Sequence, residues 1–249
     1  MDKKIVLVGA GSTSFGPSMF SDLYLSDLLI GSTIILHDIN EEKLEMIYEL
    51  LEKENEMAGN KFTLKRTTDR EEAFKDANFI INSIEVGNRM ELWWQDYKVP
   101  RKYGSTQALG ECGGPGGTFH AFRIIPPIVE IAKDIERICP EAFLISFSNP
   151  MSRVCLAIKR ATNIKFVGLC HQIQFLERDI PRMLDKKLED LEITVAGLNH
   201  FGFLLDLKEK NDDTDLVPEF NRKAMKFFME HKDPFEFSTL SFEIYKRFG

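Results

Sequence analysis

The chain has little of what marks secreted, membrane-spanning or nucleic-acid-binding proteins. It has only four cysteines in 249 residues, with no CxxC pair, which argues against a disulfide framework and favours a reducing, cytoplasmic compartment. No apolar stretch approaches the roughly 20 residues of a membrane span, so no membrane partner is expected. Basic residues form no stripe and the net charge is −7, so nucleic acid is not expected as a partner either.

The composition is that of a globular protein, with 43% hydrophobic residues and enough length for one large core and the start of a second. Apolar runs predict strands, and amphipathic stretches between them predict helices. The predicted strands span residues 4–8, 32–37, 62–67, 78–84, 142–147 and 165–169. The predicted helices span residues 17–28, 41–57, 70–75 and 122–138. Their alternation predicts an α/β fold with a doubly wound parallel sheet.

A glycine-rich turn follows the first predicted strand. Gly9 and Gly11 allow a tight turn, and Ser12 and Thr13 lead into a helix whose N-terminus can hold a pyrophosphate. The second strand stops at Asp38, where a carboxylate usually binds the ribose diol and favours NAD over NADP by repelling a 2'-phosphate. The third glycine comes late, after a Ser-Thr-Ser insertion, so the fingerprint is a variant one. We predict a Rossmann-type NAD-binding unit, and the alternative is a glycine turn without a ligand.

The pattern changes at about residue 191. Two β-rich stretches follow each other without a helix between them, which predicts an antiparallel element, and a helical segment rich in Phe and Lys comes after it. We therefore expect an NAD-binding domain over residues 1–190. Residues 191–249 are expected to begin a substrate or oligomerisation domain that is truncated at residue 249.

Three further candidates lie at strand ends or in loops. Asn149, in a Ser-Asn-Pro turn, can reach a nicotinamide ribose or a substrate hydroxyl, and the alternative is that it only terminates its strand. Arg89 can clamp a hydroxyl, a carboxylate or a phosphate, or be a solvated surface arginine. Glu111 lies in the glycine-rich stretch 110–117, which is either a loop that approaches a ligand closely or a mobile surface loop.

Cys170 and His171 end the strand predicted over residues 165–169, and His200 follows about thirty residues later. A thiolate and an imidazole suit a divalent transition metal, and two protein ligands leave positions open for substrate oxygens. Each residue also has an ordinary alternative, since cysteine is often a small buried apolar side chain and histidine a hydrogen-bonded core residue.

Taken in order, the motifs VGAGS, EVGNRM, GECGGPGG, SFSNPMS, GLCHQ and GLNHFGF resemble glycoside hydrolase family 4 over the entire chain. That family belongs to the lactate/malate dehydrogenase-like superfamily. The resemblance implies a glycosidase for α-linked glucosides, galactosides or uronides that requires NAD and a divalent metal, typically Mn²⁺. It also implies a homo-oligomer, either a dimer or a tetramer.

The resemblance further implies a redox-assisted elimination, in which NAD⁺ takes hydride from C3 of the sugar, the C2 proton is removed, the leaving oxygen is protonated, water adds and the hydride returns. Cys170 and His200 match the metal ligands and Asn149 matches a substrate contact. Glu111 matches a position that raises the basicity of a catalytic tyrosine, and that tyrosine is expected beyond residue 249. His171 stands where several α-acting members have an aspartate proton donor, and we assign it the acid role.

Two rival functions remain open. A lactate/malate-type 2-hydroxyacid dehydrogenase would need a His-Asp pair and arginines that bind a carboxylate, and His200 has no aspartate in the expected register. The other rival is an inactive NAD-binding fragment without turnover.

Overall fold

The computed structural model describes residues 2–13, 15–106, 112–230 and 237–248. The chain divides into two compact units, Met1–Leu169 and Cys170–Gly249. This boundary precedes the predicted one after residue 190, because helix α7 (Gln172–Leu184) packs with the second unit. None of the described helices is long and apolar enough to cross a bilayer.

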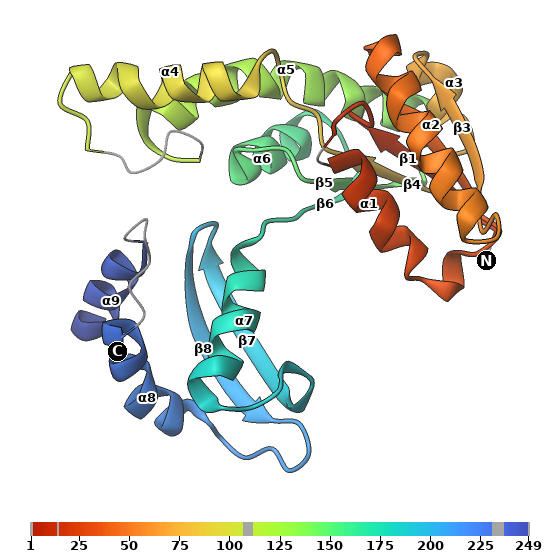
Figure 1. Ribbon diagram of the computed structural model, residues 1–249. Helices are drawn as coiled ribbons and strands as arrows, with labels where there is room; N and C mark the ends of the chain where they lie inside the picture. Colours follow the sequence, from red (N-terminus) through yellow and green to blue (C-terminus); the bar gives the residue numbers. More distant parts are fainter. Residues whose placement is uncertain (1, 14, 107–111, 231–236, 249) are drawn as a thin grey trace. The chain divides into compact units, whose positions relative to one another are not determined.

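The first unit contains a six-stranded sheet in which all neighbouring strands are parallel (Figure 1). Its strands are β1 (Lys4–Val8), β2 (Thr33–His37), β3 (Thr63–Thr67), β4 (Phe79–Asn82), β5 (Phe143–Ser146) and β6 (Lys165–Gly168). The spatial order is β3-β2-β1-β4-β5-β6. This is the order of a dinucleotide-binding Rossmann sheet, so the predicted doubly wound α/β fold is confirmed.

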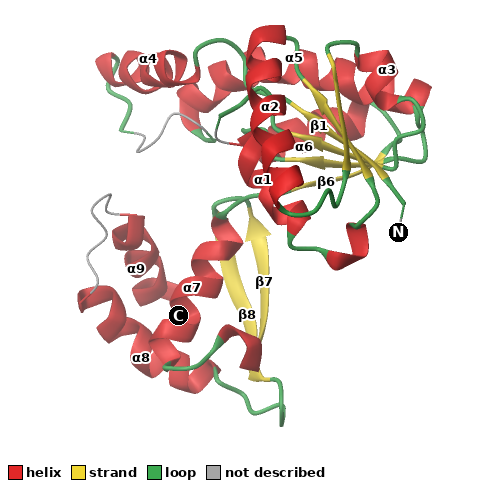
Figure 2. Ribbon diagram, turned by 45° about the vertical axis from the view of Figure 1, so that its right-hand side comes forward, coloured by secondary structure: helices red, strands yellow, loops and turns green. Residues whose placement is uncertain are grey.

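Helices cover both faces of this sheet (Figure 2). They are α1 (Phe15–Tyr24), the 3₁₀ turn η1 (Asp27–Leu29), α2 (Glu41–Met57), α3 (Arg70–Phe74), α5 (Gly114–Ile138) and α6 (Met151–Ala161). Helix α4 (Arg89–Lys102) packs against α5 instead. The strand side chains alternate between two cores, as the twofold period of a strand requires. Ile5 and Leu7 pack with α1 and α2, whereas Val6 and Val8 pack with α3, α5 and α6.

Three helices of the first unit depart from the prediction, and one of them, α6, was not predicted at all. Helix α4 was not predicted either, although the spacing of Asn88 and Glu91 is that of a capping box, and the Asn88 side chain accepts a hydrogen bond from the Glu91 amide. Helix α5 begins at Gly114, eight residues before the predicted start, so half of the glycine-rich stretch is helical rather than loop. Pro115 favours the first turn, and Gly116 and Gly117 are buried in it.

The second unit is built on an antiparallel hairpin, as predicted. Its elements are α7, the 3₁₀ turn η2 (Leu188–Asp190), β7 (Leu191–Leu198), β8 (Phe201–Glu209), α8 (Val217–Glu230) and α9 (Phe237–Phe248). A small core joins α7 to the hairpin through Ile180, Leu184, Leu191 and Leu207. Leu176, Ile180 and Leu184 recur every four residues, which places them on one face of α7.

Candidate functional site

The glycine loop is tied to the end of β2. The amides of Gly9 and Ala10 both donate to the carbonyl of His37, at 3.0 and 3.1 Å. The Gly11 amide donates to Oδ2 of Asp38 at 2.9 Å. The hydroxyl of Ser12 accepts from the Phe15 amide at 3.2 Å and so caps α1. The loop therefore places the N-terminus of α1 close to the Asp38 carboxylate.

Each glycine of this loop is needed for a close approach. Gly9 has φ of +87°, and a Cβ there would lie 3.1 Å from the amide nitrogen of Ile84. A Cβ on Gly11 would lie 2.9 Å from the Asp38 carboxylate, and one on Gly16 would lie 2.6 Å from the carbonyl of Ala10. The late third glycine thus lets α1 pack closely against the loop.

Asp38 is half-buried and its carboxylate is held on both sides. Oδ1 accepts a hydrogen bond from the Asn40 amide at 2.9 Å, while Oδ2 accepts the one from Gly11. A carboxylate oxygen can accept more than one hydrogen bond, so a fixed Asp38 is still able to receive two ribose hydroxyls. Thr13, the remaining predicted cofactor residue, is exposed on the loop.

Polar side chains join the carboxyl ends of β4 and β5, and sequence reasoning missed two of them, Asn82 and Ser146. The Asn82 amide donates to the hydroxyls of Ser146 and Ser148 at 3.2 and 3.1 Å. The Ser148 hydroxyl donates to the carbonyl of Ile84 at 2.8 Å. The sequence signal for Asn82 and Ser146 was a polar residue at the end of an otherwise apolar strand. Asn149 follows directly, half-buried and joined to Pro150 by a cis peptide bond.

The Asn149 side chain contacts the segment that precedes α5. Its Oδ1 lies 3.9 Å from the Cys112 thiol, which donates to it. In parallel α/β sheets, ligands lie beyond the carboxyl ends of the strands, so Asn149 is placed where it can contact one. Glu111, the predicted acidic residue of the same segment, lies outside the described residues.

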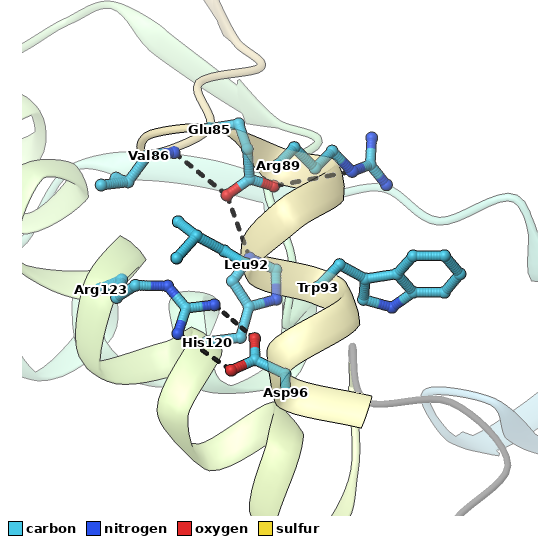
Figure 3. A pocket seen from close by; sticks show the side chains of 8 residues that line it. All are labelled: Glu85, Val86, Arg89, Leu92, Trp93, Asp96, His120 and Arg123. Carbon is cyan, nitrogen blue, oxygen red and sulfur yellow. Dashed lines mark hydrogen bonds and ion pairs between the residues drawn. The ribbon is translucent and has the colours of Figure 1, made fainter. Parts of the chain in front are cut away.

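Arg89 belongs to a cluster of charged side chains between β4, α4 and α5 (Figure 3). Glu85 lies between Arg89 and His120, with its carboxylate 3.1 Å from Nε2 of His120 and 3.9 Å from Nε of Arg89. Asp96, only 6% exposed, accepts two hydrogen bonds from the guanidinium of Arg123. The space among them is about 10 Å³, which is room for about one water molecule. A sugar does not fit inside it.

The charge of Glu85 is stabilised by its neighbours. Burial by itself would raise the pKa of Glu85, but hydrogen bonds from His120 and Val86 and the charges of His120 and Arg89 lower its pKa below the ordinary value. An ionised Glu85 attracts the guanidinium of Arg89 at 3.9 Å, and the Arg89 side chain is 53% exposed. Arg89 thus lies partly at the surface, in the first turn of α4.

In the second unit the structure brings the two predicted metal ligands together. Sγ of Cys170 lies 3.2 Å from Nε2 of His200. Two donors bound to one ion, at about 2.3 Å for sulfur and about 2.0–2.1 Å for nitrogen, lie roughly 3.1–3.6 Å apart for angles at the metal between about 90° and tetrahedral. The pair thus fits a shared divalent ion. Among the described residues no group of three or more His, Cys, Asp and Glu side chains forms a metal cluster, so the protein would supply two ligands from this part of the chain.

His200 reaches Cys170 from a tight turn. Leu198 pairs with Phe201, which leaves Asn199 and His200 as a two-residue hairpin loop. His200 has φ of +61°, in the left-handed region that few residues other than glycine adopt. Its amide donates to Oε1 of Gln172 at 2.6 Å. Sequence reasoning did not single out Gln172, although it lies in the GLCHQ motif.

His171, the predicted acid, is exposed and stands at the N-cap position of α7 without capping that helix through its side chain. Its imidazole is therefore not committed to holding the helix terminus. Its place next to Cys170 in the chain keeps it near the candidate metal site of the second unit.

The model of "Family 4 glycosyl hydrolase" matches residues 4–186, which is most of the chain. The chain belongs to glycoside hydrolase family 4. This confirms the family that the sequence motifs predicted.

Individual family members support the same assignment. An α-glucosidase of Erwinia rhapontici is 44% identical over 229 residues, which cover 92% of this chain and 51% of that protein. An α-galactosidase of Bacillus subtilis (strain 168) is 35% identical over 248 residues, covering 99% of this chain and 56% of that protein. The chain spans about half the length of the curated relatives that it matches.

The fold likewise matches that of a solved structure. The crystal structure of a 6-phospho-α-glucosidase from gut microorganisms, in complex with NAD and Mn²⁺, superposes with a TM-score of 0.81 at 25% identity. The match covers 91% of this chain and 51% of that one.

Proposed function

We propose that this chain is the NAD- and metal-binding part of a family 4 glycosidase that cleaves α-linked glucosides, galactosides or uronides. The observation that carries the proposal is the 3.2 Å separation of the Cys170 sulfur and the His200 imidazole nitrogen, across thirty residues of sequence. A thiolate and an imidazole held at this separation bind a divalent transition metal and leave positions open for substrate oxygens. The α-glucosidase and α-galactosidase relatives point to the class of substrate.

The first unit holds the nucleotide in this proposal. The loop of Gly9, Gly11, Ser12 and Thr13 opens the N-terminus of α1 toward the pyrophosphate. The Asp38 carboxylate, fixed by the Gly11 and Asn40 amides, accepts the hydroxyls of a ribose and disfavours a 2'-phosphate. When bound, NAD⁺ accepts a hydride from C3 of the sugar, and a divalent ion such as Mn²⁺ acts as a Lewis acid at the C3 oxygen.

The remaining roles belong to side chains that contact the sugar. Cys170 gives up its proton to become a thiolate ligand, and His200 binds through its neutral imidazole. His171 donates a proton to the leaving oxygen. Asn149 binds a sugar hydroxyl. Arg89 binds a hydroxyl, or a carboxylate or phosphate if the substrate carries one, and Glu111 supports the base that removes the C2 proton.

We further propose a reducing, cytoplasmic setting and a homo-oligomeric protein, as a dimer or a tetramer. The four cysteines are free thiols, and a metal ligand thiol such as Cys170 must stay reduced to bind. Sedimentation of the purified protein in the presence of a thiol reductant checks the oligomeric state.

The test of the proposal is hydrolysis of chromogenic α-glucosides, α-galactosides and α-galacturonides. It is run with this chain and with any longer natural form that contains it. We expect hydrolysis to require NAD⁺, Mn²⁺ and a thiol reductant together, without net release of NADH. Cys170→Ser removes a metal ligand and should lower turnover by at least about 100-fold. Cys155→Ser is the matched control, because burial raises the pKa of the Cys155 thiol and α6 holds it in the other unit.

Two results would overturn the proposal. One is full hydrolysis by Cys170→Ser, or by the unaltered protein after its NAD⁺ has been removed. The other is steady NADH production from lactate or malate without any glycoside cleavage, which would favour a 2-hydroxyacid dehydrogenase.

A further inference from the structure

Gln172 connects the two segments that carry the candidate metal ligands. It is the first residue of α7 and lies two positions after Cys170. Its side-chain oxygen accepts the hydrogen bond from the His200 amide at 2.6 Å, at the tip of the β7–β8 hairpin. One amide side chain therefore links the segment of the thiol to the segment of the imidazole.

The hairpin makes room for this side chain. Gly202 follows the turn on β8, and a Cβ there would lie 3.1 Å from Nε2 of Gln172. Gly202 pairs with Gly197 across the hairpin. A Cβ on Gly197 would lie 2.5 Å from the carbonyl of Phe201, which restricts this position to glycine. Gly202 thus leaves room for the Gln172 side chain, and Gly197 lets the two strands of the hairpin approach each other.

The hydrogen bond to Gln172 acts on His200, whose orientation decides whether its imidazole can share a metal ion with Cys170. His200 is in the left-handed region, which costs energy for a residue with a Cβ and persists only where neighbours hold it. The backbone conformation sets the direction in which the Cα–Cβ bond of His200 leaves the turn. A hydrogen bond at the His200 amide therefore helps to aim the imidazole at the Cys170 sulfur.

We propose that Gln172 is a positioning residue for the metal site, which it preorganises by holding the turn at His200. This inference rests on the proposed function, because it takes the Cys170 and His200 pair as metal ligands. Gln172 itself binds neither metal nor substrate in this proposal. Side chains that hydrogen-bond to a metal ligand and fix its orientation commonly change metal affinity by about 10–100-fold when they are removed.

The hairpin does not depend on Gln172 for its folding. The β7–β8 ladder runs over eight paired positions, and Leu191 and Leu207 anchor it in a core at the other end of the strands. A substitution at Gln172 should consequently alter metal binding much more than stability.

The test is a titration with Co²⁺, whose bond to a thiolate gives a charge-transfer absorption band that reports Cys170 directly. Gln172→Leu keeps the size of the side chain but lacks the acceptor, and should weaken Co²⁺ binding by about 10-fold with an unchanged melting temperature. Gln172→Glu keeps an acceptor oxygen and should bind at least as tightly as the unaltered protein. Glu177→Leu, an exposed position on the same helix, is the matched control and should change nothing.

Each result decides the inference. Equal Co²⁺ affinity in Gln172→Leu and the unaltered protein overturns it and leaves the proposed function intact. Absence of the charge-transfer band in the unaltered protein overturns both. If Gln172→Leu lowers the melting temperature, Gln172→Asn, whose amide is one methylene too short to reach, decides instead. A fall in affinity for Gln172→Asn at an unchanged melting temperature supports the inference, and an unchanged affinity overturns it.

Discussion

At the scale of single residues, the sites depend on backbone positions that tolerate few side chains. Gly9 and His200 both have positive φ angles, one in the nucleotide loop and one at the hairpin tip. Gly9 meets this requirement without a Cβ, whereas His200 keeps its imidazole at an energetic cost. A strained residue of this kind indicates a functional constraint on His200.

The steric role of Gly9 can be separated from its φ angle. Gly9 and Gly31 have nearly the same φ, +87° and +88°, but a Cβ on Gly31 would meet nothing within 4 Å. We expect Gly31→Ala to lower the free energy of unfolding by roughly 1–2 kcal/mol, from the backbone conformation alone. Gly9→Ala should cost at least about 1 kcal/mol more, because its Cβ would press on the backbone of Ser83 and Ile84. Urea unfolding measures both, and equal losses would contradict this account.

At the scale of elements, the candidate site residues lie where strands end. Asp38 follows β2, Glu85 and Arg89 follow β4, and Asn149 follows β5. Parallel strands place all these ends on one edge of the sheet, which is why residues distant in sequence become neighbours there. Helix α5 adds His120 and Arg123 from the side, and these two fix the carboxylates of Glu85 and Asp96.

The free energy of unfolding should also fall in acid, because β2 ends at the buried His37. His37 is 3% exposed, and its Nδ1 donates to the carbonyl of Thr67 at 3.0 Å. Burial lowers the pKa of His37 from its ordinary value of 6.5, and the hydrogen bond to Thr67 offsets this only in part. The unfolded chain therefore binds the proton more readily. The stabilisation that the neutral, buried His37 gives to the folded state is fully present above about pH 6.5. It is lost as the pH falls through the lower pKa that His37 has in the folded protein.

The prediction is tested by urea unfolding at about pH 7.5 and about pH 5.5. His37→Gln should reduce the loss of unfolding free energy between these two values, because glutamine does not titrate there. His171→Gln, at an exposed position, is the control and should keep the full loss. If His37→Gln retains the same pH dependence as the unaltered protein, burial of His37 is not its cause.

At the scale of the whole molecule, the proposed nucleotide site and the proposed metal site belong to different units. Asp38 and the glycine loop lie in Met1–Leu169, and Cys170 and His200 lie in Cys170–Gly249. Each unit has its own apolar core. The chemistry proposed for the protein thus combines two binding functions. A destabilising substitution in one unit should impair the binding function of that unit and spare the other.

Paired core substitutions test this separation. Leu207 and Leu36 are both 0% exposed, one in each unit, and Leu→Ala at such sites costs about 2–5 kcal/mol. Leu207→Ala should speed hydrogen exchange over residues 170–230 and leave NAD⁺ affinity within about twofold of the unaltered protein. Leu36→Ala should do the reverse and weaken NAD⁺ binding. Faster exchange throughout the chain in both variants would show that the units unfold as one.

Much of the architecture was predictable because its signals are local. The apolar run of β1, the glycine turn after it and the stop of β2 before Asp38 lie within about forty residues and have regular spacings. Helix α2 (Glu41–Met57) was predicted over the whole of its length, since Asn40 caps it and its apolar residues recur at helical spacing. The order of the motifs was sufficient to predict the family.

The amino-acid sequence by itself thus determined the parallel α/β unit, its glycine-rich loop and the hairpin after residue 190. Only the tertiary structure decided that the Cys170 sulfur meets the His200 ring, that Gln172 holds the turn between them, and that α5 begins inside the glycine-rich stretch. The physical reason is the distance along the chain over which each kind of interaction acts. Propensity, capping and periodicity act over a few residues, whereas the meeting of two side chains thirty residues apart depends on how α7 and the hairpin pack on their shared core.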